Sequence, residues 1–93
     1  MIRSFHDRET ERIWNGERSR KLPPEIQDRA LGRLRMLNRA RTLDDLASPP
    51  GLRLHALQKD REGQHSVSIN MQWRICFIWR DGGAERVEIT DYH

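Results

Sequence analysis

Apolar residues change their spacing about halfway along the chain. Between residues 24 and 47 they recur every three or four positions, and after Gly51 they alternate with polar residues. The first spacing is typical of one buried face of an α-helix, and alternation is typical of a β-strand with one buried face. The segment Ser48-Pro49-Pro50-Gly51 separates the two patterns and breaks the helical one. The pattern predicts an α+β domain whose helices precede most of its sheet.

Three helices are expected in the first half of the chain. The strongest begins at Pro23-Pro24-Glu25 and runs to about Ala40, because proline suits the first helical turn. Its apolar residues recur at helical spacing: Ile26, Ala30, Leu34 and Leu37. A weaker helix should extend from Asp7, a suitable N-cap, to Asn15, and the polar segment from Glu17 to Lys21 is expected to be mobile. Thr42 and Asp45 resemble a capping box and predict a short third helix.

Five strands are expected, at residues 1–5, 52–58, 65–70 and 73–79 and from 84 to the C-terminal end. Asp81-Gly82-Gly83 is a typical hairpin turn before the last of them. Alternation places four side chains of the fourth strand on one face: Trp73, Ile75, Phe77 and Trp79. The same rule places Leu52, Leu54 and Ala56 on one face of the second strand, and Glu85, Val87 and Ile89 on one face of the last. Together they predict a twisted antiparallel sheet of four to five strands packed against the N-terminal helices.

Composition and charge narrow the class of partner. The chain has 93 residues, which predicts a single domain over residues 1–93. Its net charge is +3, and it has 15 arginines but only two lysines. Arginine binds phosphate through two N–H groups, so this bias favours a nucleic-acid partner. Five arginines on or after the long helix are candidates for nucleic-acid contacts or, equally, a solvated helix face: Arg29, Arg33, Arg35, Arg39 and Arg41.

Several classes of protein and site are disfavoured. No apolar run approaches the ~20 residues that a membrane span needs, and Met1 to Arg8 lacks the apolar region of a signal peptide, so a cytoplasmic location with no membrane partner is expected. The single cysteine, Cys76, lies within a strand pattern and is expected to be a buried thiol. The four histidines have no metal-binding spacing, and no cofactor or metal is expected.

A few polar side chains of the predicted sheet could carry chemistry. His55 and Arg74 lie within apolar strands, and Asp91-Tyr92-His93 ends the chain. RNA can be cleaved without metal when a base activates its 2′-hydroxyl, an acid protonates the departing 5′-oxygen and a cation stabilises the charged phosphate; histidine and arginine suit these roles. Each residue also has a structural interpretation: a solvent-exposed histidine, an arginine paired with an acid and a fraying end.

Beyond these patterns, the chain resembles the HigB-type toxins of the RelE superfamily, also known as plasmid maintenance system killer proteins. The resemblance is carried mainly by four segments: Leu54-His55-Ala56-Leu57, Asp60-Arg61-Glu62-Gly63-Gln64-His65-Ser66, Trp73-Arg74-Ile75-Cys76-Phe77 and Asp91-Tyr92-His93. It implies a microbial RNase fold and a toxin of a type II toxin–antitoxin system that cleaves mRNA on the 70S ribosome and inhibits translation. It also implies a HigA-like helix-turn-helix antitoxin that neutralises the toxin, and repression of the shared operon by the complex on operator DNA.

The resemblance also assigns residues. It implies that His55, Arg74, Asp91, Tyr92 and His93 form the catalytic site, with His55 and His93 as candidates for proton transfer and Arg74 for phosphate contact. Some relatives carry a lysine where this chain has Gln58. Three interpretations are open: a bulge brings Lys59 round, Arg53 or Arg61 supplies the charge, or the enzyme is weaker. We therefore expect Arg53, Gln58, Lys59 and Arg61 to contact RNA.

Two other functions are compatible with the patterns. The first is a non-catalytic nucleic-acid-binding module in which the basic helix binds and the C-terminal tail is inert, although no helix-turn-helix pair or aromatic RNA-recognition motif is present. The second is a structural protein that binds a partner along a sheet edge, which leaves Arg74 and the C-terminal cluster unexplained.

Overall fold

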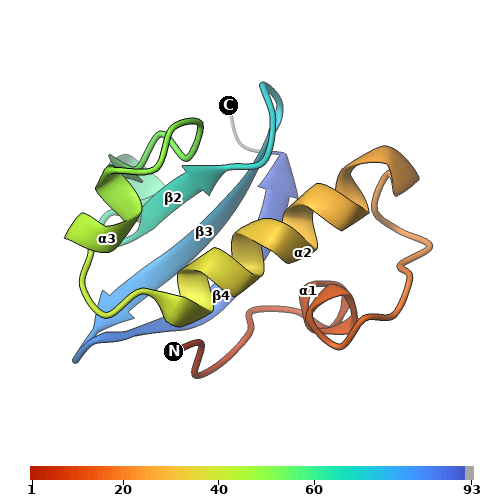
Figure 1. Ribbon diagram of the computed structural model, residues 1–93, viewed down its shortest axis with the longest axis horizontal. Helices are drawn as coiled ribbons and strands as arrows, with labels where there is room; N and C mark the ends of the chain where they lie inside the picture. Colours follow the sequence, from red (N-terminus) through yellow and green to blue (C-terminus); the bar gives the residue numbers. More distant parts are fainter. Residues whose placement is uncertain (92–93) are drawn as a thin grey trace.

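The fold is a four-stranded antiparallel sheet with helices on one side (Figure 1). The computed structural model describes residues 1–91. Three helices come first, α1 (Arg8–Trp14), α2 (Pro24–Arg39) and α3 (Asp44–Ala47). The sheet follows, with strands β1 (His55–Ala56), β2 (His65–Ser68), β3 (Trp73–Arg80) and β4 (Gly83–Asp91) in that spatial order, and a short 3-10 helix η1 (Lys59–Arg61) after β1. This arrangement confirms the predicted α+β class and the order of helices before sheet.

The core lies between α2 and the sheet. The four apolar residues expected on one face of α2 are all buried: Ile26, Ala30, Leu34 and Leu37. They share a hydrophobic cluster with Ile75 and Phe77 of β3, and Trp73 and Trp79 pack against the same cluster. The predicted face of this strand is therefore correct. None of the helices within residues 1–91 is long and apolar enough to cross a membrane.

The segment after α1 is held in place, so the expectation of a mobile segment is wrong. Asp7 caps α1 as predicted, since its carboxylate accepts a hydrogen bond of 2.7 Å from the Thr10 N–H. Ser19 is buried, and its main chain forms two hydrogen bonds with the Gln27 side chain, of 3.0 and 2.8 Å. The Ser19 hydroxyl also donates to Glu9 at 2.6 Å. Polar composition concealed this anchor because serine and glutamine are usually exposed.

The predicted capping box before the third helix is formed in one of its two halves. The Thr42 hydroxyl does not cap it; instead, the Asp45 carboxylate accepts hydrogen bonds from the main-chain N–H groups of Arg41 and Thr42, at 2.8 and 3.1 Å. These bonds stabilise the charged carboxylate and lower the pKa of Asp45. The acid of the predicted pair thus closes the turn that leads into α3.

A bulge in β4 corrects the predicted face of the last strand. The pairing of β3 with β4 shifts between Cys76 and Ile78, and Arg86 adopts a left-handed φ of 52°. The extra residue breaks the alternation, so Ala84 and Val87 both point into the core although they are three positions apart. Glu85, which was expected to share a face with Val87, instead forms ion pairs with Arg3 and Arg80.

The N-terminal segment pairs with the outer edge of β4 in a parallel direction, so it does not extend the antiparallel order. Its bridges join Ile2 to Ala84 and Phe5 to Val87, which matches the three-residue spacing of the bulge. Its register therefore departs from the simple alternation expected for residues 1–5. The Arg3 guanidinium donates to the carbonyls of Arg80 and Asp81 at 2.8 and 2.6 Å.

The strand expected at residues 52–58 is reduced to the two residues of β1. Arg53 has a left-handed φ of 47°, which interrupts the extended backbone before the strand starts. Leu52 and Leu54 join the core as expected, but Ala56 is exposed and Leu57 is buried in its place. The departure from regular alternation also changes how the residues after β1 are presented.

Candidate functional site

The sheet face opposite α2 carries a row of polar side chains that crosses all four strands. His55 of β1 lies opposite Ser66 of β2, Ser66 opposite Cys76 of β3, and Cys76 opposite Glu88 of β4. Directly opposed residues in a sheet project from the same face. Arg74 lies on this face too, two residues from Cys76, so the sheet brings the predicted His55 and Arg74 to one surface.

A groove of 660 Å³ opens at the β1 end of this row. Its lining includes His55, Ser66 and Arg74 together with the whole segment from Ala56 to Arg61. Arg74, Lys59 and Arg61 give the groove three fixed positive charges against one acid, Asp60, so it favours an anionic ligand. The histidine and the arginine that chemistry singled out thus share one basic groove.

Two hydrogen bonds hold the Arg74 guanidinium in place. Its Nε donates to the Ser66 hydroxyl at 2.8 Å, and its Nη2 donates to the Arg53 carbonyl at 2.8 Å. A guanidinium has five N–H groups, so three remain for a ligand. Nε and Nη2 are engaged, but within residues 1–91 both N–H groups of Nη1 remain for a phosphate. Arg74 is therefore positioned before any ligand binds.

The rim of the groove is the short helix η1, and it changes the interpretation of Gln58. Lys59 begins η1 with a left-handed φ of 57°, and Gln58 and Lys59 both line the groove. A tight turn, rather than a bulge in a regular strand, therefore brings Lys59 to the same hollow as His55. Within residues 1–91 no ion pair is formed by the Lys59 ammonium, so its charge can reach a ligand.

Arg61 and Arg53 differ from Lys59. Arg61 lines the groove but also forms an ion pair of 3.0 Å with Glu88 and donates to Gln64 at 3.2 Å. Its charge is thus largely matched by Glu88. The Arg53 side chain is not part of the groove lining, and its contribution is the main-chain carbonyl that accepts from Arg74. The structure therefore does not bring the Arg53 side chain to the predicted RNA-contact set.

The C-terminal cluster lies only partly within the described residues. Asp91 ends β4 opposite Trp73 and accepts a hydrogen bond of 2.8 Å from the Gln72 amide. Asp91 does not line the groove. Tyr92 and His93, the other two predicted members of the cluster, lie outside the described residues. The structure thus brings His55 and Arg74 together and places Asp91 at the end of the adjacent strand.

Cys76 lies within the row, between Ser66 and Glu88, and is fully buried, as predicted. Burial raises the pKa of the Cys76 thiol, with a smaller opposing effect from the nearby Arg61 charge. The thiol therefore stays protonated near neutral pH and is a poor nucleophile. Cys76 acts as part of the sheet beneath the groove.

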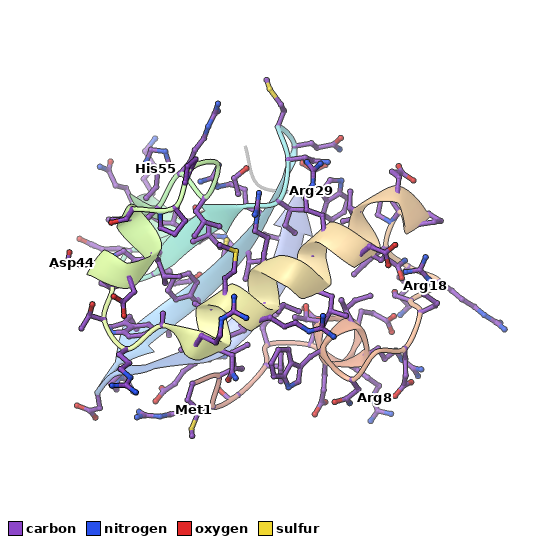
Figure 2. All side chains as sticks on the ribbon, viewed as in Figure 1. Met1, Arg8, Arg18, Arg29, Asp44 and His55 are labelled. Atoms are coloured by element: carbon purple, nitrogen blue, oxygen red, sulfur yellow. The ribbon has the colours of Figure 1, made fainter. Side chains whose placement is uncertain are left out.

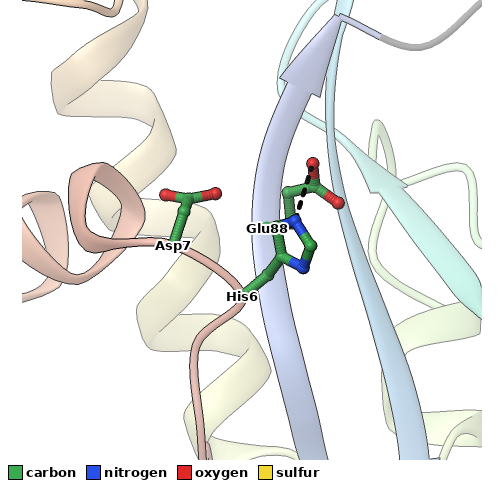
Figure 3. Close-up of side chains that lie close together, drawn as sticks. All are labelled: His6, Asp7 and Glu88. Carbon is green, nitrogen blue, oxygen red and sulfur yellow. Dashed lines mark ion pairs between the residues drawn. The ribbon is translucent and has the colours of Figure 1, made fainter.

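Glu88 and Ser66 are site residues that sequence reasoning missed. Both are polar residues in strands where polar and apolar residues alternate, so the sequence does not single them out. Only the structure shows that Ser66 contacts Arg74 and that Glu88 pairs with Arg61. Glu88 also lies 3.9 Å from His6, and His6, Asp7 and Glu88 form a group of possible metal ligands (Figure 3). Both carboxylates of this group already have partners, because Asp7 caps α1 and Glu88 is paired with Arg61.

Two of the basic residues of α2 are structural. Arg29 and Arg33 donate to the main-chain carbonyls of Ile69 and Ser68, at 3.5 and 3.0 Å, and so attach α2 to the end of β2. Arg35 and Arg39 remain exposed on the helix, and Arg41 is exposed just after it. The predicted basic helix face is therefore divided between packing and solvent.

Comparison with known proteins gives one consistent picture. Residues 3–93 match the family model described as the RelE-like toxin of type II toxin–antitoxin system HigB. The chain is 33% identical to Toxin HigB-1 of Vibrio cholerae serotype O1 over 85 residues, which cover 90% of each chain. It is 30% identical over 93 residues to Endoribonuclease HigB of Proteus vulgaris, with 100% of both chains covered.

A solved structure, that of the YoeB–YefM complex from Staphylococcus aureus, has the same fold. The match has a TM-score of 0.61 and covers 100% of this chain and 98% of the other. The sequence identity is 13%, so the likeness concerns the fold alone. It confirms the predicted RelE-like α+β arrangement.

Proposed function

The chain belongs to the HigB-like family of RelE-like type II toxins, and from that membership and its basic groove we propose that it is a ribosome-dependent endoribonuclease that cleaves mRNA without a metal ion. The name of the Proteus vulgaris relative supports the endoribonuclease activity. In this proposal residues 1–93 act as one toxin domain, and cleavage of mRNA in the ribosomal A site stops translation.

The reaction uses the 2′-hydroxyl of the RNA as the nucleophile. A base removes the 2′-hydroxyl proton, the 2′-oxygen forms a bond to the adjacent phosphorus, and the bond from phosphorus to the 5′-oxygen breaks. An acid protonates the departing 5′-oxygen, which leaves a 2′,3′-cyclic phosphate and a 5′-hydroxyl. His55 and His93 are assigned to the two proton transfers, since histidine exchanges protons near neutral pH. Arg74 stabilises the additional negative charge on the phosphate.

The observation that carries the proposal is the way Arg74 is held in the groove that His55 also lines. Its bonds to Ser66 and to the Arg53 carbonyl fix the guanidinium and leave one edge available. A cation placed before the reaction stabilises developing charge without further reorganisation, which is the most effective form of electrostatic catalysis. Lys59 and Gln58 on the same groove are assigned to the neighbouring RNA backbone, with Arg61 beside them. In the C-terminal cluster, Tyr92 is assigned to base stacking and Asp91 to orienting His93.

The proposed partners follow from family membership. A type II toxin is paired with a protein antitoxin, and the structural neighbour is a complex of YoeB with YefM. We propose a helix-turn-helix antitoxin that neutralises this chain and carries the pair to operator DNA, where the complex represses its own operon.

The proposal is tested by growth after induced expression, with and without the neighbouring gene, and by cleavage of mRNA on purified ribosomes. We expect growth arrest that the antitoxin relieves, and RNA fragments that end in a 2′,3′-cyclic phosphate. Arg74→Ala should lower the cleavage rate by about 10²–10³-fold, as is typical when a preorganised donor to the transition state is removed. Arg35→Ala is the matched control, because Arg35 is an exposed arginine away from the groove.

Two results would contradict the proposal. If folded Arg74→Ala arrested growth as strongly as the wild type, Arg74 would have no catalytic role. If the wild-type chain bound ribosomes but cleaved no mRNA, the chain would be the non-catalytic nucleic-acid-binding module that the sequence also allows. Circular dichroism of each variant shows whether it is folded.

A further inference from the structure

A second basic hollow lies between α1 and the segment that follows it. It has a volume of 470 Å³, and its lining residues are all charged: Glu9, Arg12, Arg18, Arg20 and Lys21. Four of the five carry a positive charge. Figure 2 places Arg18 at the end of the molecule away from His55, so this basic hollow is separate from the groove.

The positive charges of the basic hollow are only partly matched. Glu9 accepts from the Ser19 hydroxyl at 2.6 Å and lies 3.6 Å from Arg12. Arg18 pairs with Asp28 at 3.0 Å, but the side chains are 64% and 93% exposed, and such surface pairs are weak and readily exchanged. Within residues 1–91 the side chains of Arg20 and Lys21 form no hydrogen bond or ion pair.

The backbone that carries these charges is anchored by hydrogen bonds. The Ser19 hydroxyl, between Arg18 and Arg20, accepts from the N–H groups of Lys21 and Leu22 at 3.1 and 3.2 Å. Together with the two bonds to Gln27, these contacts fix the loop on both sides of the buried serine. A ligand would therefore meet basic side chains on an ordered backbone, and less conformational entropy is lost on binding.

The composition of the basic hollow distinguishes between possible ligands. Protein interfaces have a core of apolar and aromatic side chains, and this lining has none. A nucleic-acid backbone needs no apolar wall, because it is bound through its phosphates. Three of the four cations are arginines, whose planar fork matches a phosphate. The lining of the basic hollow therefore favours a phosphodiester backbone over an acidic polypeptide.

We propose that the basic hollow binds the phosphate backbone of ribosomal RNA while mRNA occupies the groove. This inference rests on the proposed function, since a ribosome is the assembly in which the chain would meet both RNAs. Arg20 and Lys21 provide the two uncompensated charges, and Ser19 is the positioning residue that holds them.

The test measures binding of the full chain to purified 70S ribosomes over a range of salt concentrations. The chain carries His55→Ala, so that mRNA stays intact. Adding Arg20→Glu with Lys21→Glu should weaken the affinity by about tenfold or more, and should reduce the slope of log K against log salt by about 1.5, because each phosphate contact contributes ~0.7–0.9. Arg8→Glu with Arg86→Glu is the matched control, with the same change of net charge at exposed positions outside the groove and the basic hollow.

The outcomes separate this inference from the proposed function. If the two double variants lost ribosome affinity equally, or if the Arg20 and Lys21 variant lost none, the basic hollow would not be a specific RNA-binding site. If the Arg20 and Lys21 variant lost binding to polyglutamate but kept ribosome affinity, the ligand would be an acidic polypeptide instead of RNA. Ribosome binding could depend on Arg20 and Lys21 although the chain with His55 intact cleaves no mRNA. That result would support the basic hollow as an RNA-binding site and contradict the endoribonuclease proposal.

Discussion

The two faces of the sheet are built from the same strands and have opposite properties. One face packs Ile75 and Phe77 against α2, and the other carries Ser66, Arg74 and Glu88. Alternation along a strand places consecutive residues on opposite sides, so stability and chemistry are encoded in neighbouring positions without sharing a surface. A substitution in β2 or β3 should therefore change mainly the free energy of unfolding or mainly the cleavage rate, depending on which face it occupies.

The largest effect is expected on the α2 face. Phe77 is fully buried in the core, and Phe77→Ala should lower the free energy of unfolding by about 3–5 kcal/mol, because it removes apolar contacts and leaves a cavity. Urea denaturation measures this value. Ile78→Ala is the control, since Ile78 is only half-buried and lies outside the core cluster, and it should have a smaller effect. Equal losses at the two positions would contradict the division between faces.

A smaller effect, on activity, is expected from the groove face. Ser66→Ala removes the hydroxyl that accepts from Arg74, and should lower kcat for mRNA cleavage by about 10–100-fold, in line with the ~1.5–3 kcal/mol of a hydrogen bond to a charged group. Ser68→Ala is the control, because its hydroxyl donates to the Asn70 carbonyl instead. Ser66→Thr should restore much of the rate, as it keeps a hydroxyl. A purely structural role for Ser66 would change stability and leave kcat of the folded enzyme unaltered.

The smallest effect on stability and activity is expected from substitution of Cys76, whose side chain is buried. Because burial raises the pKa of its thiol, Cys76 should react slowly with iodoacetamide at pH 8 in the folded chain and rapidly in urea. Cys76→Ala should cost about 1 kcal/mol or less of stability and leave mRNA cleavage unchanged. Fast labelling of the folded chain, or loss of cleavage in the variant, would show that the thiol is accessible or takes part in the reaction.

Local periodicity predicted the features that depend on one element at a time. The long helix, the face of β3 and the buried state of Cys76 all follow from spacing within a single segment. The bulge at Arg86, the parallel pairing of Ile2 and Phe5 and the turn at Lys59 depend on how two segments meet, and no single-segment pattern contains that information. The anchoring of Ser19 was missed for the same reason, because its partners lie on α1 and α2.

The sequence predicted those residues of the candidate site whose type is unusual for their position in a strand. A histidine and an arginine within apolar strands are conspicuous, and the family resemblance assigned them roles. Ser66 and Glu88 have the polar character of any exposed strand position, and only the register places them beside Arg74 and Arg61. The Arg53 side chain was predicted to contact RNA, but in the structure Arg53 serves the site through its main-chain carbonyl, which accepts from Arg74. A sequence does not show whether a residue acts through its side chain or its main chain.

The pairing of the N-terminal segment with β4 has a kinetic consequence. Ile2 and Phe5 meet partners 82 residues later in the chain, and the row that begins at His55 is completed only when Glu88 has joined the sheet. Contacts between distant parts of a chain require the closure of long loops and slow the folding of a domain. During synthesis, helices α1 and α2 can form early, but the polar row cannot be completed until β4 has left the ribosome that makes it. The order of synthesis thus delays the appearance of a complete site until nearly all of these residues have been made.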